Sequence, residues 1–179
     1  ARLADTPPAR VALQTIFAAA LADVAPPSLP PAVRDAYEIL DREAGMPSAG
    51  PAGAPDGDRE PFDPERAYQA AEDEMVSFGG FSLGGLLSPL RQLSFWKMKD
   101  RARRFGESGG FQLLCDLQRA APVERGVRFH LMGHSFGCIV VSAILAGPGG
   151  RGQLVRPVHS VALIQGALSL WSYASEIPC

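Results

Sequence analysis

Gly133-His134-Ser135-Phe136-Gly137 follows directly on residues 127–132, an apolar run rich in Val, Phe, Leu and Met. Such a run is suited to a buried parallel strand, and the small, apolar residues 138–146 that come next are typical of a helix packed under a sheet. Strand, glycine turn and helix in this order predict a nucleophile elbow, in which a serine occupies the apex of a sharp turn in a strained backbone conformation. Ser135 is therefore the candidate nucleophile.

Each neighbour of Ser135 has an expected part in the turn. Gly133 and Gly137 flank the apex, where we expect a Cβ to collide with the adjoining strand or helix. His134 is expected to turn its side chain away from the serine, toward the packing around the turn. The start of the following helix would favour developing negative charge at Ser135. The alternative is a plain strand-to-helix connection whose serine has no chemical role.

Composition excludes several classes of protein. A chain of 179 residues with a hydrophobic content of 46% is typical of a soluble globular domain, and the net charge is −2. No basic run with interleaved aromatic residues predicts a nucleic-acid partner, and no Cys/His spacing predicts a metal site. Three cysteines, two of them in apolar helical patterns, favour a reducing, cytoplasmic compartment. The apolar stretch 11–25 contains polar residues and is too short for a membrane span.

The first half of the chain predicts helices. A first helix ends before Pro26-Pro27, and further helices are expected over residues 31–44, over 63–78 with Asp63 as the N-cap, and over 88–105. The face of the second helix is marked by Val33, Tyr37 and Leu40. The first helix carries apolar residues at helical spacing, which we expect to form its buried face: Leu13, Ile16, Phe17, Ala20, Leu21 and Val24.

The remaining segments complete an α/β pattern. Residues 45–62 are rich in Gly, Pro, Ala and Asp and predict a flexible linker, so that 1–62 form a helical segment and 63–179 a second part. The glycines of residues 106–110 are expected to interrupt the helical chain before a helix over 111–121. A second buried strand is predicted over 158–165.

The two predicted strands, 127–132 and 158–165, with the helix between them, form a βαβ unit of a parallel sheet. The expected fold class is therefore α/β, with a helical N-terminal half and a partial sheet. Two strands are few for a parallel sheet that is buried on both faces, and the chain opens on Ala1. We therefore expect residues 1–179 to be a fragment of a longer polypeptide.

Residues 93–175 resemble the α/β-hydrolase superfamily, and in particular its bacterial serine hydrolases of undefined substrate. The resemblance is carried by Ser94-Phe95-Trp96-Lys97-Met98-Lys99, by the elbow, and by Leu163-Ile164-Gln165-Gly166-Ala167. It implies that Ser135 is the nucleophile and that the backbone N–H of Phe136 is one oxyanion-hole donor. It implies hydrolysis of an acyl or other small-molecule ester, thioester or amide through an acyl-enzyme, without a cofactor or a metal.

In the rest of the catalytic machinery, this chain departs from the pattern of the superfamily. Its acid and histidine follow the serine in later loops, which places both beyond Cys179, and no second oxyanion donor is visible before residue 106. His130 and His159 are interpreted as structural. Glu176 is either the acid or a solvated loop carboxylate. We therefore expect residues 1–179 alone to be inactive.

Two questions stay open at this point. Trp171 and Tyr173 follow the second strand and could line an acyl pocket or pack in the core. A non-catalytic binding or scaffold protein that keeps the elbow for structural reasons is the main alternative to a hydrolase, and a transferase that uses an alcohol in place of water is a third possibility.

Overall fold

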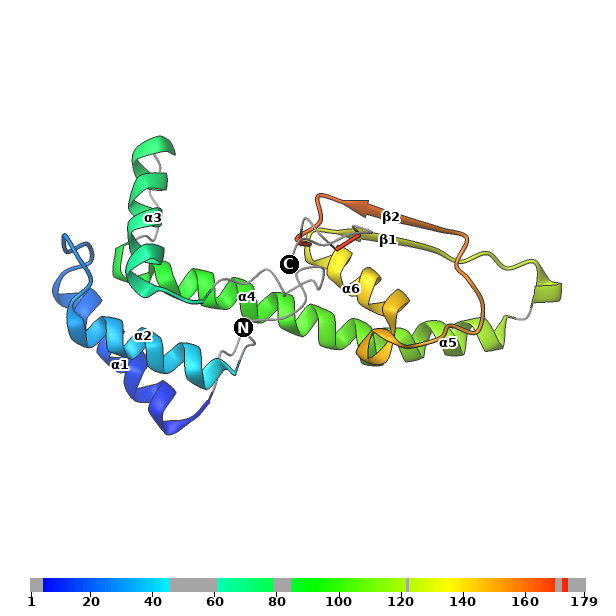
Figure 1. Ribbon diagram of the computed structural model, residues 1–179, viewed down its shortest axis with the longest axis horizontal. Coiled ribbons are helices and arrows are strands. Elements are labelled where there is room, and N and C mark those ends of the chain that lie inside the picture. The colour runs from blue at the N-terminus through cyan, green and yellow to red at the C-terminus, as the bar shows by residue number, and fades with distance from the viewer. Residues whose placement is uncertain (1–4, 46–60, 79–84, 122, 170–171, 174–179) are drawn as a thin grey trace. The chain divides into compact units, whose positions relative to one another are not determined.

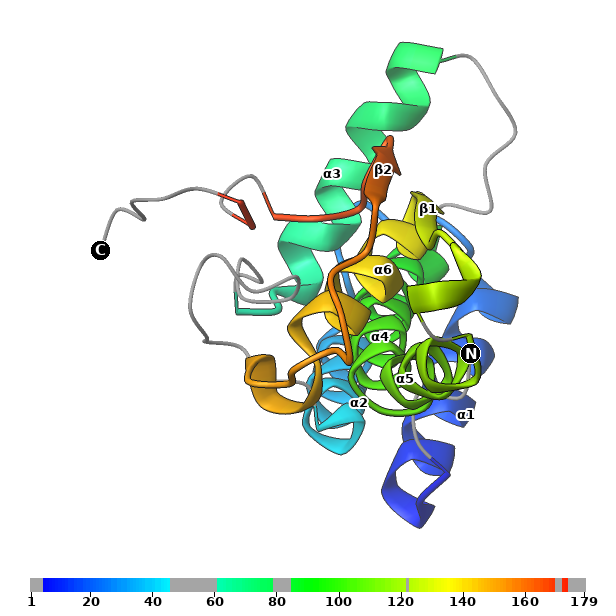
Figure 2. The same cartoon turned by 90° about the vertical axis from the view of Figure 1, so that its right-hand side faces the viewer.

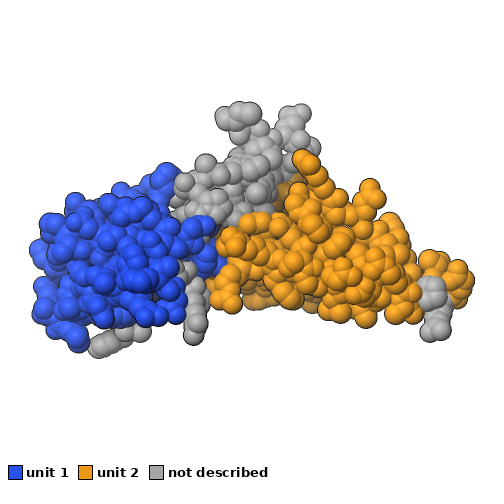
Figure 3. All heavy atoms as spheres, turned by 90° about the horizontal axis from the view of Figure 1, so that it is seen from below, with its two compact units in different colours: residues 1–49, 59–97 blue, residues 50–58, 98–179 orange. Residues whose placement is uncertain are grey.

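The structure is a computed structural model that describes residues 5–45, 61–78, 85–121, 123–169 and 172–173, without the side chains of 72–78 and 125. Helices predominate, and the described strands form a two-stranded parallel sheet in the second half of the chain (Figure 1). The mixed α/β character expected from the sequence is thus confirmed. The chain divides into two compact units, residues 1–49 with 59–97 and residues 50–58 with 98–179 (Figure 3).

Unit 1 is built from α1 (Pro7–Ala22), α2 (Pro31–Ala44), α3 (Pro64–Phe78), the 3-10 turn η1 (Gly85–Leu87) and the start of α4 (Ser88–Phe105). The helix starts follow their predicted signals. Asp63 Oδ1 accepts hydrogen bonds from the N–H groups of Glu65, at 2.9 Å, and Arg66, at 3.1 Å, which confirms it as the N-cap of α3. At the end of α2, Gly45 takes the left-handed conformation that closes a helix.

The core of unit 1 contains two buried tyrosines whose hydroxyl groups both have partners. Tyr37 donates to the carbonyl of Leu86, and Tyr68 donates to the carbonyl of Pro26. Burial raises the pKa of Tyr37, so that the phenol stays protonated and remains a donor. The same core cluster includes the predicted face of α2, and its fully enclosed members are Ala9, Ala12, Ile16, Leu29, Val33, Ala36, Tyr37, Leu40, Tyr68, Leu86 and Leu93.

The face predicted for α1 is right only in part: Ile16 is buried, and Leu13 and Ala20 pack against the core as partly buried residues. Ala9, Ala12 and Ile16 are buried, whereas Phe17 is 48% and Leu21 89% exposed. Helix α1 packs against α2, and the buried residues of α1 include Ala9 and Ala12, whose small side chains allow two helix backbones to approach closely. The prediction followed the largest apolar residues and therefore displaced the buried face from Ala9 and Ala12 toward Phe17 and Leu21.

The compact units have other bounds than the two parts of the chain that the sequence predicted. The sequence suggested a boundary at residue 62, but α3 packs with α2 and η1, and the unit boundary along α4 lies between Lys97 and Met98. The contact from Tyr68 to Pro26 is one reason, because it binds α3 to the chain that precedes α2. Most of the predicted linker 45–62 lies outside the described residues.

The predicted interruption at residues 106–110 is also wrong. These residues form a π-helical turn, η2 (Gly106–Gly110), that joins α4 to α5 (Phe111–Ala120). A Cβ on Gly106 would lie 2.6 Å from Val140 O, and one on Gly110 would lie 2.8 Å from Ile144 Cγ1. The glycines therefore allow α6 to approach the turn closely while the chain remains helical.

The sheet of unit 2 consists of β1 (His130–His134) and β2 (Ser160–Ile164), joined by α6 (Phe136–Ala146). The strands are parallel, with His130 opposite Ser160 and His134 opposite Ile164. Helix α6 lies beside the two strands, as Figures 1 and 2 show. Strand β1 begins later than the predicted 127–132 and runs beyond its predicted end, through Gly133 and His134, whereas β2 lies within the predicted 158–165. A hydrogen bond from His159 N–H to Phe129 O extends the pairing one step before both strands.

The strands are more exposed than the apolar pattern predicted. Met132 is 72% exposed and Ile164 is 46% exposed, while Gly133 is buried against α6. Within the described part of the chain, the sheet has two strands and α6 packs against one of its faces. Side chains that alternate to the other face are therefore open to solvent. Among the described helices, none combines the length and the apolar character needed to cross a bilayer.

Candidate functional site

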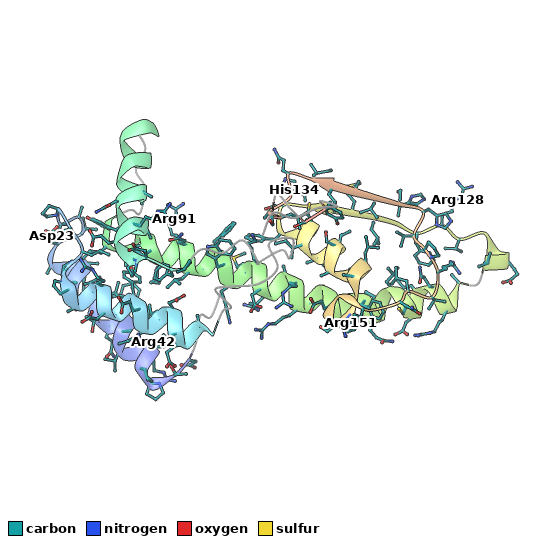
Figure 4. The ribbon with its side chains drawn as sticks, in the orientation of Figure 1. Asp23, Arg42, Arg91, Arg128, His134 and Arg151 are labelled. Atoms are coloured by element: carbon teal, nitrogen blue, oxygen red, sulfur yellow. The ribbon has the colours of Figure 1, made fainter. Side chains whose placement is uncertain are left out.

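Ser135 occupies the single position between β1 and α6. Its backbone angles are φ 54° and ψ −119°, a conformation that costs a residue with a Cβ about 1–3 kcal/mol. The structure therefore has the strand, sharp turn and helix that the sequence predicted around this serine. Figure 4 labels the preceding residue, His134, at the carboxyl end of β1.

The two flanking glycines differ in how tightly they are enclosed. A Cβ on Gly133 would lie 2.5 Å from Gly137 O and 2.7 Å from Cys138 N, so only glycine fits there. A Cβ on Gly137 would meet nothing within 4 Å in the described structure. The predicted collision at Gly137 is therefore wrong, because the first turn of α6 turns this position away from β1.

Backbone hydrogen bonds hold the elbow against the end of β2. The Ser135 N–H donates to Ile164 O at 3.1 Å, and the Ser135 carbonyl accepts from Ala167 N–H at 3.2 Å and from Cys138 N–H at 3.1 Å. The buried thiol of Cys138 lies 3.2 Å from Gly133 O and 3.4 Å from Ile164 O. Both faces of the strained residue are thus tied to neighbouring backbone, which supplies the stabilisation that the conformation requires.

The same bonds orient the peptide that joins Ser135 to Phe136. In a trans peptide the C=O and the next N–H point in opposite directions, and the described chain contains no cis bond. Because the Ser135 carbonyl is directed at Ala167, the Phe136 N–H points away from it. This N–H stands at the first residue of α6, where the helix dipole is positive.

Comparison with protein-family models, curated proteins and solved structures finds no match to this chain.

His134 differs from its prediction. Its side chain is exposed instead of packed around the turn, and its Nε2 lies 2.9 Å from Oε1 of Gln165. The histidine tautomer and the orientation of the amide set which of the two side chains donates in this hydrogen bond. The elbow is consequently bonded to the end of β2 by a side-chain pair as well as by backbone.

The other two histidines lie at the opposite ends of the strands. His130 Nδ1 is 2.7 Å from Ser160 Oγ, and His159 Nδ1 accepts the N–H of Phe129 at 3.0 Å. At about 3.3 Å per strand residue, His130 is roughly 16 Å from Ser135. Neither ring contacts the elbow, and the described residues place no histidine or carboxylate in hydrogen-bond contact with Ser135.

Of the remaining candidate residues, the structure describes Tyr173. Tyr173 is 64% exposed and its hydroxyl lies 2.6 Å from Ser142 Oγ on α6, so the interpretation as a core residue is wrong. Trp171 and Glu176 lie outside the described residues. Within the described chain, no group of three or more His, Cys, Asp and Glu side chains comes together to hold a metal ion.

One residue of this site escaped the sequence analysis as an individual position. Gln165, directly after β2, has φ 46°, and with Ser135 it makes up the non-glycine residues with positive φ in the described chain. Glycine and asparagine signal such a conformation, whereas glutamine does not. Only the neighbourhood of the elbow could have directed attention to it.

Proposed function

We propose that the chain carries the nucleophile of a serine hydrolase of the α/β-hydrolase type, which acts on an ester, thioester or amide through an acyl-enzyme on Ser135. The observation that supports it most is the backbone of Ser135, a strained residue with a Cβ that lies between a parallel strand and a helix. Strain of this kind persists at functional sites, where it presents a reacting group. The resemblance of the three sequence segments adds to this support.

The geometry of the turn at Ser135 would support an acyl-transfer reaction. The Ser135 hydroxyl attacks the acyl carbon, and the negative charge that develops on the acyl oxygen faces the Phe136 N–H and the positive end of α6. The leaving group departs with a proton, and water then releases the acyl group and restores the serine. No step of this sequence calls for a metal or a cofactor.

A serine hydroxyl needs a base, and this need defines the second candidate function. The described residues bring no base into contact with Ser135, which favours a binding or scaffold protein that keeps the elbow for structural reasons. Under the hydrolase proposal, the base and the acid are not among the contacts that the described residues make with Ser135.

The test is labelling of the full-length protein with a fluorophosphonate, followed by peptide mapping of the modified residue. We expect modification at Ser135. The variant Ser135→Ala should lose labelling and at least about 10³-fold in turnover of acyl esters, with a nearly unchanged melting temperature, because the hydroxyl contributes chemistry and little packing. Ser160→Ala is the matched control, since Ser160 is exposed at the far end of β2 and should label as wild type. Labelling that survives Ser135→Ala, or no labelling of the wild type, would favour the scaffold.

A further inference from the structure

Gln165 is strained in the same sense as Ser135 and lies next to it. Both residues follow directly on parallel, hydrogen-bonded strands, Ser135 after β1 and Gln165 after β2. A left-handed conformation is uncommon for any residue with a Cβ and persists only where surrounding contacts hold it. Surrounding contacts must therefore hold Gln165 in this conformation. The hydrogen bonds described on and beside Gln165 connect it to the elbow.

The end of β2 is bonded to the elbow on both sides of Gln165. Before it, Ile164 O accepts the Ser135 N–H at 3.1 Å, and after it, Ala167 N–H donates to Ser135 O at 3.2 Å. Between these, Oε1 of the Gln165 carboxamide is in hydrogen-bond contact with His134 Nε2, at 2.9 Å. Without the left-handed turn at Gln165, the chain would continue in the strand direction and Ala167 could not reach back to the serine carbonyl.

The Ser135 carbonyl accepts from Ala167 N–H and from Cys138 N–H, and these two bonds together decide where the Phe136 N–H points. The peptide between Ser135 and Phe136 is planar and trans, so fixing its carbonyl fixes its N–H. A rotation of this plane would turn the donor away from an acyl oxygen held at Ser135. Misplacement by about 1 Å at a reacting centre can cost about 10²-fold in rate.

We propose that Gln165 is a positioning residue of the Ser135 site: its carboxamide, held by His134, keeps the turn after β2 in the conformation that aligns the Ser135–Phe136 peptide. This inference rests on the proposed function, because it assigns Gln165 a part in acylation of Ser135. Gln165 itself takes no proton and forms no bond to the substrate. Its contribution passes through Ala167 and the serine carbonyl.

The test compares Gln165→Glu with Gln165→Met in the full-length protein. A glutamate retains an oxygen acceptor for His134, whereas methionine has similar length and no comparable acceptor. The saturating rate of inactivation by a fluorophosphonate should fall about tenfold in Gln165→Met, with the apparent affinity for the probe within about twofold of wild type. Gln165→Glu should restore most of the rate. Gln112→Met, on the exposed face of α5, is the matched control and should change neither quantity.

A second readout does not depend on chemistry. Hydrogen exchange of the Ala167 amide, followed by NMR, should accelerate in Gln165→Met and stay as in wild type in Gln165→Glu. Unchanged exchange of this amide in Gln165→Met would overturn the inference, as would equal loss of labelling rate in both variants. A wild-type protein that is not labelled at Ser135 contradicts the proposed function instead, and the exchange measurement still decides the role of Gln165.

Discussion

Gly133 and Gly137 flank the same serine, yet the structure constrains them differently. A methyl group at Gly133 would overlap the backbone of Gly137 and Cys138, which has no freedom to move away because Cys138 N–H is bonded to Ser135 O. Gly137 has open space around its missing Cβ in the described structure. The pentapeptide pattern treats the two positions alike, and only the packing of α6 against β1 separates them.

We predict that Gly133→Ala lowers the free energy of unfolding by about 1–3 kcal/mol, because the strand and the helix must separate to admit the methyl group. Gly137→Ala should leave it unchanged or raise it by up to about 1 kcal/mol, since alanine favours a helix. Urea unfolding of the full-length variants measures both effects. Equal destabilisation by the two substitutions would show that Gly137 is enclosed by parts of the protein outside the described residues.

At the residue scale, the sequence predicted those parts of the site in which the residue type itself determines the local backbone. Ser135 and Gly133 stand in a pattern whose geometry follows from the need for a tight turn. The direction of the His134 side chain could not be inferred, because it depends on Gln165, which is distant in the sequence and adopts a conformation that glutamine does not signal. A partner as distant in the sequence as Gln165 cannot be recognised from the residues beside His134.

At the scale of elements, helix ends were predictable and helix faces less so. Proline at the start of α2, Asp63 before α3 and Gly45 after α2 act through local backbone hydrogen bonds or fixed dihedral angles, which the sequence alone specifies. The buried face of α1 depends on which surface α2 covers. Alanines of α1 are buried, whereas the larger Phe17 and Leu21 are exposed. Apolar spacing cannot make that choice when two stripes compete.

The π-helical turn η2 is the element whose glycines were misinterpreted. Glycine disfavours a helix in isolation, so residues 106–110 predicted a break. In the folded chain, Gly106 is buried with Val140 O and Ala143 Cβ both 2.6 Å from the place where its Cβ would be. Close packing of α6 thus offsets the cost of glycine in a helix.

We predict that Gly106→Ala lowers the free energy of unfolding by about 1–3 kcal/mol, although alanine is the better helix former, because α6 must move away. Gly109→Ala is the matched control within the same turn. Its Cβ would lie 3.6 Å from the nearest atom, on the Phe105 ring, which is an ordinary contact, so the substitution should be neutral or stabilising by up to about 1 kcal/mol. Chemical denaturation of the two variants provides the comparison, and a stabilising Gly106→Ala would contradict the packing argument.

At the scale of the whole molecule, the continuous hydrophobic cluster that includes Tyr37 and Leu40 is made by unit 1. The sequence predicted helices for this part of the chain but assigned α3 to the other part, because a Gly- and Pro-rich stretch marks a connection without showing what packs across it. Unit 2 has the elbow and a sheet with an exposed face. The candidate site and the main core therefore belong to different units.

This division predicts independent responses to damage in the core of unit 1. Leu40 is fully buried, so Leu40→Ala should cost about 2–5 kcal/mol and accelerate amide hydrogen exchange in α1 and α2 by about 30-fold or more. Exchange in β1 and α6 should stay as in wild type, because the main contacts described for these elements lie within unit 2.

Hydrogen exchange followed by mass spectrometry of peptides from each unit measures the two responses in one sample. Leu113→Ala is the matched control, since Leu113 is 59% exposed and its loss should leave exchange in both units unchanged. Faster exchange in α6 to the same degree as in α2 would show that the chain opens as one cooperative unit, in which case stability at Ser135 would depend on the helical core. If exchange accelerates only in α1 and α2, the geometry of the elbow is maintained by the contacts of unit 2 alone.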